Sequence, residues 1–140
     1  MEQKDMNRIT EYLVSSLLKN GFVIQRYDSY STNSIYLKLD YGVCNSIRIS
    51  DHPGKKHLKY RYNIGPHIKK FSKEKDKYDR YYYRSDKCKN LVKKILCDRQ
   101  VKIDRYGKEK YESYMRENAR DKSNNAGFWR DARLITLEEF

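Results

Sequence analysis

The sequence has few of the residues that build phosphate-binding loops, disulfide frameworks and zinc sites. Its 6 glycines are scattered at turns, so neither a glycine-rich phosphate loop nor a nucleophile elbow is present. Its 3 cysteines show no C-x-x-C spacing, which argues against both a disulfide framework and a zinc site. No cluster of carboxylates is found either. We therefore expect a protein that is not an enzyme and that holds no metal or other cofactor.

Histidine is also scarce, and its 3 copies lie close together in the sequence. His52 follows Asp51, and a carboxylate beside an imidazole can orient a general base. Adjacent residues on an extended chain point apart, however, and Asp51 before His-Pro-Gly is typical of a turn. A turn is therefore favoured over a catalytic pair. His52, His57 and His67 match no spacing of metal ligands, which disfavours a metal site.

Long apolar runs are absent. No stretch approaches the roughly 18 apolar residues of a membrane span, and the first residues are too acidic and polar for a signal peptide. Only 38% of the residues are hydrophobic and 36% are charged, which predicts a modest core built partly from the 14 tyrosines. We expect a small soluble protein in the cytoplasm of a bacterial host, without membrane contact.

Positive charge is what the sequence has in excess. The formal net charge is +12, and the segment from Lys55 to Lys94 holds 15 Lys and Arg against 4 Asp and Glu. An AT-rich genome also favours lysine, but genome composition would not concentrate the charge in one segment. Such a concentration attracts phosphate backbones and acidic protein surfaces.

The hydrophobic pattern predicts an α+β fold: an antiparallel sheet of three to four strands, with an N-terminal helix and one or two C-terminal helices. Apolar residues three and four positions apart predict the first helix, and alternation or β-branched runs predict the strands. The second helix begins near a capping serine or aspartate. The expected elements are a helix over Asp5 to Lys19, strands at Phe22 to Tyr27, Ile35 to Asp40, Val43 to Ser50 and Leu58 to Ile64, and a helix from Ser85.

Two regions interrupt or follow this core. Residues 66–85 show no periodicity and predict a basic insertion, either a mobile loop or partly ordered. We expect residues 1–100 to form one α+β domain, and residues 101–140 to form a charged helical and aromatic extension. The aromatic tail is too apolar for a free end, so it should cover the sheet or meet a partner.

Basic and aromatic residues alternate in the strand that begins at Leu58, and two arginines flank three tyrosines in the run Arg80 to Arg84. Aromatic rings can stack on bases while neighbouring cations neutralise phosphates. The alternative is that Tyr60 and Tyr62 belong to the core and that the three consecutive tyrosines of the run only cover the end of a helix. The residues expected to bind a partner or a nucleic acid are Arg48, Lys55, Lys56, Lys59, Arg61, Lys69, Lys70, Arg80, Tyr82 and Arg84.

The segment from Ser29 to His52 has a serine-rich loop with a tyrosine, followed by a strand that reads Ile-Arg-Ile-Ser-Asp-His. This pattern resembles small type II-A anti-CRISPR proteins of Gram-positive phages and mobile elements. The matching positions are Ser31, Ser34, Tyr36, Ile47, Arg48, Ser50, Asp51 and His52. The resemblance implies a non-enzymatic inhibitor that binds a type II RNA-guided effector nuclease or its guide RNA and blocks DNA cleavage. A positively charged protein is not expected to mimic DNA.

Two alternatives remain open at this point. The order of helix and strands is shared with double-stranded-RNA-binding domains, so a module that recognises the RNA or DNA backbone is the second hypothesis. The third is a small HicA-like ribonuclease that uses His52, although the expected second strand lacks the histidine that such an enzyme needs. The sequence predicts no oligomeric state.

Overall fold

A computed structural model describes residues 3–29, 33–50, 58–63 and 78–139; the side chains of residues 3, 4, 61–63, 78–80 and 139 are outside this description. The expected α+β class is confirmed, but the sheet has six strands rather than three or four. The helices are α1 (Gln3–Lys19), α2 (Cys88–Tyr106) and α3 (Lys108–Arg120). The strands are β1 (Ile24–Asp28), β2 (Ser34–Leu39), β3 (Ser46–Ser50), β4 (Leu58–Asn63), β5 (Tyr78–Tyr83) and β6 (Arg133–Ile135).

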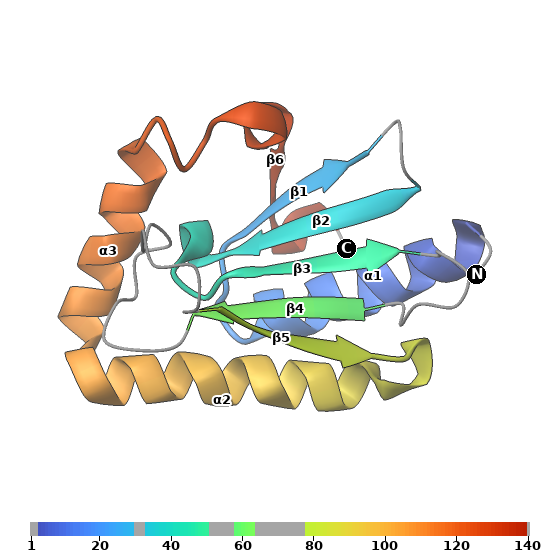
Figure 1. Ribbon diagram of the computed structural model, residues 1–140, viewed down its shortest axis with the longest axis horizontal. Helices are drawn as coiled ribbons and strands as arrows, with labels where there is room; N and C mark the ends of the chain where they lie inside the picture. Colours follow the sequence, from blue (N-terminus) through green and yellow to red (C-terminus); the bar gives the residue numbers. More distant parts are fainter. Residues whose placement is uncertain (1–2, 30–32, 51–57, 64–77, 140) are drawn as a thin grey trace.

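All neighbouring strands are antiparallel, in the order β5-β4-β3-β2-β1-β6. Strands β1 to β5 follow one another as a meander, and β6 returns from the end of the chain to pair with β1 (Figure 1). The two strands that sequence analysis missed are β5 and β6. Three consecutive tyrosines hide the alternation of β5, and β6 has only 3 residues.

In Figure 1, α1 lies behind the sheet and α2 runs along its β5 edge; both helices contribute to the core on this side of the sheet. Both helices bury an apolar stripe against alternate residues of the strands, as periods of 3.6 and 2 require. Because polar residues occupy the other positions, this single face holds the main core. Its fully buried members include Met6, Leu13 and Leu17 of α1, Leu91 and Ile95 of α2, and Leu37, Ile47, Ile49, Leu58 and Tyr60 of the strands.

The turn between β2 and β3 is built on left-handed residues. Asp40 and Tyr41 have φ angles of 52° and 55°, and Asn45 has a φ of 62°. Aspartate and asparagine tolerate this region better than most residues, whereas a tyrosine there is strained. The expected turn at Asp40-Tyr41-Gly42 is confirmed as the short 3-10 turn η1 (Asp40–Gly42). Backbone hydrogen bonds stabilise it, including 2.8 Å from the Leu39 N to the Asn45 O.

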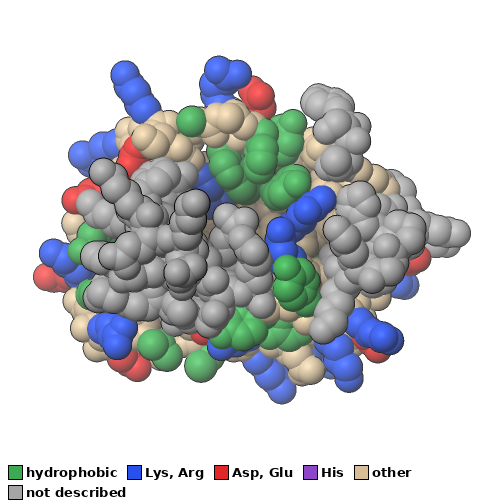
Figure 2. Space-filling view, in the orientation of Figure 1, with side chains coloured by type: hydrophobic (Ala, Val, Ile, Leu, Met, Phe, Trp, Pro, Cys, Tyr) green, Lys and Arg blue, Asp and Glu red, His purple; other side chains and the backbone are tan. Residues whose placement is uncertain are grey.

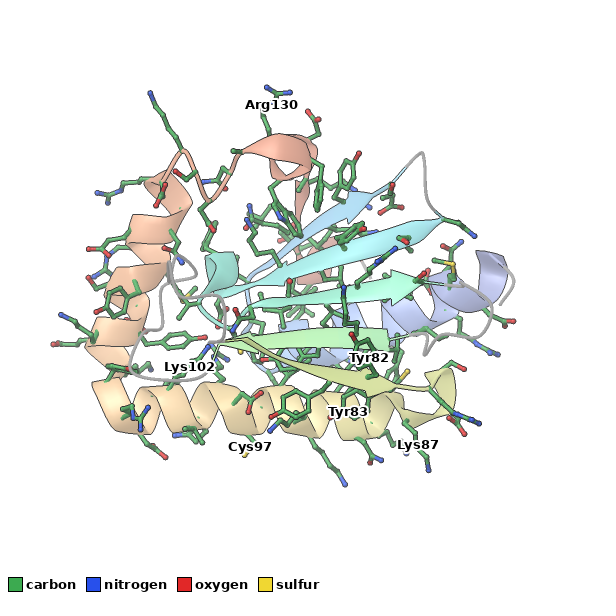
Figure 3. The ribbon with its side chains drawn as sticks, viewed as in Figure 1. Tyr82, Tyr83, Lys87, Cys97, Lys102 and Arg130 are labelled. Atoms are coloured by element: carbon green, nitrogen blue, oxygen red, sulfur yellow. The ribbon has the colours of Figure 1, made fainter. Side chains whose placement is uncertain are left out.

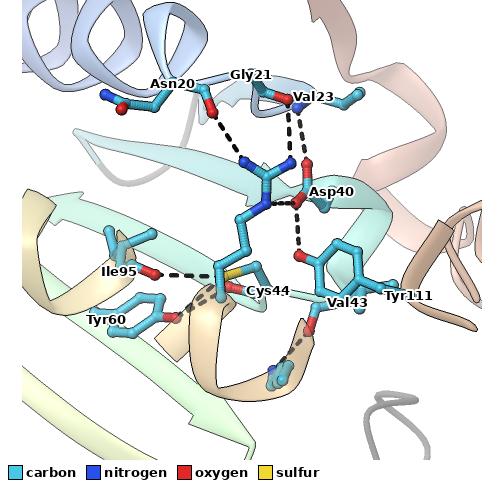
Figure 4. Close-up of polar contacts among 11 residues, drawn as sticks. Asn20, Gly21, Val23, Asp40, Val43, Cys44, Tyr60, Ile95 and Tyr111 are labelled. Atoms are coloured by element: carbon cyan, nitrogen blue, oxygen red, sulfur yellow. Dashed lines mark hydrogen bonds and ion pairs between the residues drawn. The ribbon is translucent and has the colours of Figure 1, made fainter. Parts of the chain in front are cut away.

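The Asp40 side chain ties this turn to the C-terminal helices (Figure 4). Its carboxylate accepts hydrogen bonds from the Val23 amide at 2.9 Å and from the Tyr111 hydroxyl at 2.6 Å. It also forms an ion pair with Arg99 at 3.2 Å. Burial raises the pKa of Asp40, while Arg99 and Tyr111 oppose that shift. Because the carboxylate is fully enclosed, its role is structural.

The C-terminal part of the chain continues the fold. Helix α2 passes through residue 100, the boundary expected between domain and extension, and α3 lies across one end of the sheet (Figure 1). Tyr111 of α3 is buried with Val43 in a second, small apolar cluster. The tail covers part of the sheet, through β6 and the 3-10 turn η3 (Gly127–Asp131). None of the described helices is long and apolar enough to cross a membrane.

Candidate nucleic-acid interface

The face of the sheet opposite α1 and α2 carries a row of side chains that crosses five strands. In the β-ladders, Tyr27 pairs with Tyr36, Tyr36 with Arg48, Arg48 with Lys59, and Lys59 with Tyr82. Residues paired across antiparallel strands point to the same face and lie close together. The result is a row of two aromatic residues, two basic residues and one aromatic residue. We call this side of the sheet the open face.

The row is accessible to a partner. Tyr82 is 47% exposed, and the other four side chains are half-buried. Figure 2 looks onto this face and shows green hydrophobic side chains next to blue basic ones over the middle of the sheet. No described side chain that β1 to β5 place on this face is a carboxylate. The open face therefore has a positive potential that its own strands do not neutralise.

Arg48 is held in place at the centre of the row. Its guanidinium donates hydrogen bonds to the Ser34 hydroxyl at 3.3 and 3.4 Å. The same group lies 5.7 Å from the centre of the Tyr36 ring, at the outer range of a cation–π contact. Neither Ser34 nor Tyr36 is charged. These contacts therefore orient Arg48 without neutralising its positive charge.

Aromatic residues from the C-terminal tail pack on the part of the row that β1 and β2 supply. The Phe128 ring stacks on Tyr27 with 4.7 Å between ring centres and also lies 4.7 Å from Tyr36. Trp129 lies 4.8 Å from Phe128 and meets Tyr36 edge to face at 6.4 Å. We call Tyr27, Tyr36, Phe128 and Trp129 the aromatic cluster. It joins β1 and β2 to η3, segments far apart in the sequence.

Lys38 holds the tail against the sheet. Its side chain points to the open face but is almost completely buried. The ammonium group donates a hydrogen bond to the backbone oxygen of Asn124 and lies 4.4 Å from the centre of the Trp129 ring. Asn124 in turn donates to the Tyr41 oxygen at 2.9 Å. The loop before η3 is thus anchored to β2 and to its turn.

The structure brings part of the expected binding set together. Arg48, Lys59 and Tyr82 are neighbours in the row, and Arg84 is exposed just beyond β5. Arg61 and Arg80 pair with each other in the ladder between β4 and β5, but their side chains lie outside the described residues. The other four expected residues also lie outside it: Lys55, Lys56, Lys69 and Lys70.

The stacking role considered for Tyr60 is wrong, and the alternative that it belongs to the core is correct. Its ring is fully buried on the helix side, and its hydroxyl donates to the Cys44 oxygen at 3.2 Å. Tyr81 and Tyr83 also pack against the core. Figure 3 shows Tyr82 over the sheet and Tyr83 toward α2, as alternation along a strand requires. Tyr62 lies outside the described side chains.

Sequence reasoning missed the aromatic cluster and Lys38 as site residues. The alternation of β2 already placed Tyr36 and Lys38 away from the core, which was the available signal. Phe128 and Trp129 stood out only as members of an apolar tail. Nothing local in the sequence pairs that tail with Tyr27 and Tyr36.

Buried thiols and polar groups on the helix side offer no reactive centre. Cys44 is fully buried, and burial raises its pKa to about 11; Cys88 donates to the Ser85 oxygen at 3.0 Å, and burial raises its pKa as well. A raised pKa keeps a thiol protonated and weakly nucleophilic at neutral pH. Lys102 donates to the Val43 oxygen at 2.6 Å, and burial lowers its pKa.

The described part of the chain contains no cluster that could hold a metal, and none of its residues is a histidine. No three described His, Cys, Asp or Glu side chains gather in a way that could hold a metal. Asp51 and all three histidines, His52, His57 and His67, lie outside the described residues. The ribonuclease hypothesis and the turn at Asp51 therefore stay predictions. His52→Ala with unchanged activity on RNA would remove the former.

No protein-family model, no curated protein and no solved structure matched this chain. Function is therefore inferred from the geometry and charge of the open face.

Proposed function

We propose that this protein binds nucleic acid through the open face of its sheet, and that it acts by binding rather than by catalysis. The observation that carries the proposal is the cross-strand row, in which Arg48 and Lys59 stand between tyrosines. With roughly 4.8 Å between strands, the row extends about 19 Å from β1 to β5. That length suits a polymer with repeating phosphates rather than a small molecule.

The charge of the face supports a phosphate backbone as the ligand. Arg48 is positioned by the neutral Ser34 and Tyr36, so binding a phosphate does not require it to give up a carboxylate partner there. Cations that neutralise phosphates release condensed counterions, which makes affinity fall steeply with salt. The backbone pair Arg61 and Arg80 lies next to the row in the same ladder.

A charge-reversal experiment tests this proposal. Arg48→Glu with Lys59→Glu should weaken binding of a labelled oligonucleotide by about tenfold or more at low salt and flatten the salt dependence. Lys89→Glu with Lys93→Glu is the matched control, because it changes the net charge equally and both lysines are exposed on α2, whose apolar residues pack on the helix side. Fluorescence anisotropy with RNA and DNA, single-stranded and duplex, gives the affinities. Equal affinities for the double variant and the control would contradict the proposal.

A second function, inhibition of a type II effector nuclease, is favoured by one specific observation. Ser34, Tyr36 and Arg48 come from the segment that resembles anti-CRISPR proteins, and on the open face Arg48 is hydrogen-bonded to Ser34 and lies over the Tyr36 ring. In this proposal the open face binds the effector or its guide RNA and blocks DNA cleavage. The resembling segment then supplies contact residues as well as scaffold.

Co-purification of the tagged protein with a guide-loaded type II effector, followed by a cleavage assay, separates the two functions. Capture that persists in salt that abolishes binding to free guide RNA, with cleavage blocked, supports the inhibitor. Binding to free nucleic acid without capture of the effector supports a nucleic-acid module alone. Arg48→Glu should weaken whichever activity is found.

A further inference from the structure

The aromatic cluster is incompletely covered. Phe128 lies against Tyr27 and Tyr36, and it still exposes 37% of its surface. The part of the Phe128 ring that faces solvent does not pack against the core. Base-aromatic stacking needs such a surface, because every base has a flat π face.

The cluster lies next to the cations of the proposed interface. Tyr36 belongs to the aromatic cluster and pairs directly with Arg48 in the ladder between β2 and β3. On the other side, the buried Lys38 lies 4.4 Å from the Trp129 ring and fixes its position. A nucleic acid bound along the row would therefore meet cations first and then reach an exposed ring at the β1 end.

Only an unpaired strand can use both features together. In a duplex the faces of the bases are stacked inside the helix, so a protein surface meets phosphates and groove edges. A single strand can turn a base onto a ring while its phosphates contact the cations. A purely electrostatic face would need the cations but no exposed ring beside them.

We propose that the aromatic cluster, through Phe128, is a base-stacking site that makes this protein prefer single-stranded nucleic acid to duplex. The inference rests on the proposed function and specifies its ligand. Phe128 supplies the stacking surface, Tyr27 and Tyr36 support its ring from beneath, and Lys38 holds the tail that carries it. Arg48 and Lys59 bind the neighbouring phosphates.

The protein contains a built-in probe of this site. Trp129 is the only tryptophan of the chain and lies 4.8 Å from Phe128. A base stacked on Phe128 should therefore change the tryptophan fluorescence. The titration uses a single-stranded homopyrimidine oligonucleotide, the same strand with abasic positions, and a duplex of equal length. Anisotropy of end-labelled copies measures binding independently of the tryptophan.

The variants separate stacking from charge and from folding. Phe128→Ala should weaken binding of the base-bearing strand by about tenfold and leave binding of the abasic strand unchanged. Phe128→Leu keeps apolar volume but removes the π face, so it should reproduce this loss with an unchanged unfolding temperature. Leu137→Ala is the control, because Leu137 is similarly exposed and lies beside α1.

The outcomes distinguish the inference from the function on which it rests. Tighter binding of the base-bearing strand than of the abasic strand and the duplex, with a change in Trp129 fluorescence lost in Phe128→Leu, would support it. Equal, salt-dependent binding of all three ligands with unchanged fluorescence would overturn the stacking site and leave nucleic-acid binding intact. Failure of all three ligands to bind would overturn both.

Discussion

The two faces of the sheet use the same residue type for opposite purposes. Tyr60 on the helix side is fully buried, and its hydroxyl is hydrogen-bonded to the Cys44 backbone. Tyr36 and Tyr82 on the open side keep part of their rings accessible, next to Arg48 and Lys59. Tyrosine content by itself therefore does not indicate a binding surface. The strand register decides which rings contribute stability and which are available to a partner.

The largest expected effect separates adjacent residues of β2. Leu37→Ala should lower the free energy of unfolding by about 2–5 kcal/mol, because it leaves a cavity among fully buried neighbours. Tyr36→Ala should cost less stability but weaken oligonucleotide binding. Urea denaturation and anisotropy on both variants measure the contrast. Equal losses of stability would show that the two faces do not differ as described.

Removing the Asp40 carboxylate should have the next largest effect. Asp40→Ala leaves Arg99 and the Tyr111 hydroxyl without a buried partner and should lower the free energy of unfolding by about 3 kcal/mol. Tyr111→Phe removes one of these contacts and should cost about 1 kcal/mol. Urea denaturation measures both. Since neither residue lies on the open face, a loss of nucleic-acid affinity in folded Tyr111→Phe would contradict the division between the faces.

The helix side should also show a pH dependence at Cys44. The unfolded thiol ionises near pH 9, whereas burial keeps the folded thiol protonated up to a pKa of about 11. This contribution to stability is present below pH 9 and is lost as pH rises through about 11, by about 3 kcal/mol. Unfolding free energies measured from pH 8 to pH 10.5 should fall less steeply for Cys44→Ala. Parallel curves for both proteins would contradict the burial of this thiol.

The smallest expected effect compares neighbouring tyrosines of β5. Tyr82→Ala should weaken oligonucleotide binding several-fold and change stability by less than about 0.5 kcal/mol, because Tyr82 is exposed. Tyr83→Ala should lower stability and leave oligonucleotide binding unchanged, because Tyr83 packs against the core. Thermal unfolding and anisotropy measure the pair. The same response from both variants would show that the register of β5 is not the one described.

Much of the fold could be predicted because its signals are local. The stripe of Met6, Ile9 and Leu13 and the alternation of Ile35, Leu37 and Leu39 predict a helix and a strand from a few neighbouring residues. The same alternation correctly placed Lys59 away from Tyr60. β5 could not be predicted in this way, because Tyr81, Tyr82 and Tyr83 have equal hydropathy and only pairing with β4 assigns their faces.

The candidate site was only partly predictable. Arg48 and Lys59 were expected from charge, and the row that joins them needed the register of four ladders. The link between Lys38 and Asn124 needed the path of the whole C-terminal region. Contacts between distant segments have no local sequence signature, since they form only when the C-terminal region folds back onto β1 and β2.

The sequence by itself determined the α+β class, the inward and outward residues of β2, β3 and β4, and the excess of positive charge. These properties depend on residue type and on short periodicities. Only the tertiary structure decided that β6 closes onto β1 and that Phe128 and Trp129 lie on Tyr27 and Tyr36. The physical reason is that this cluster is created by long-range strand pairing and burial, which bring together residues that no local pattern connects.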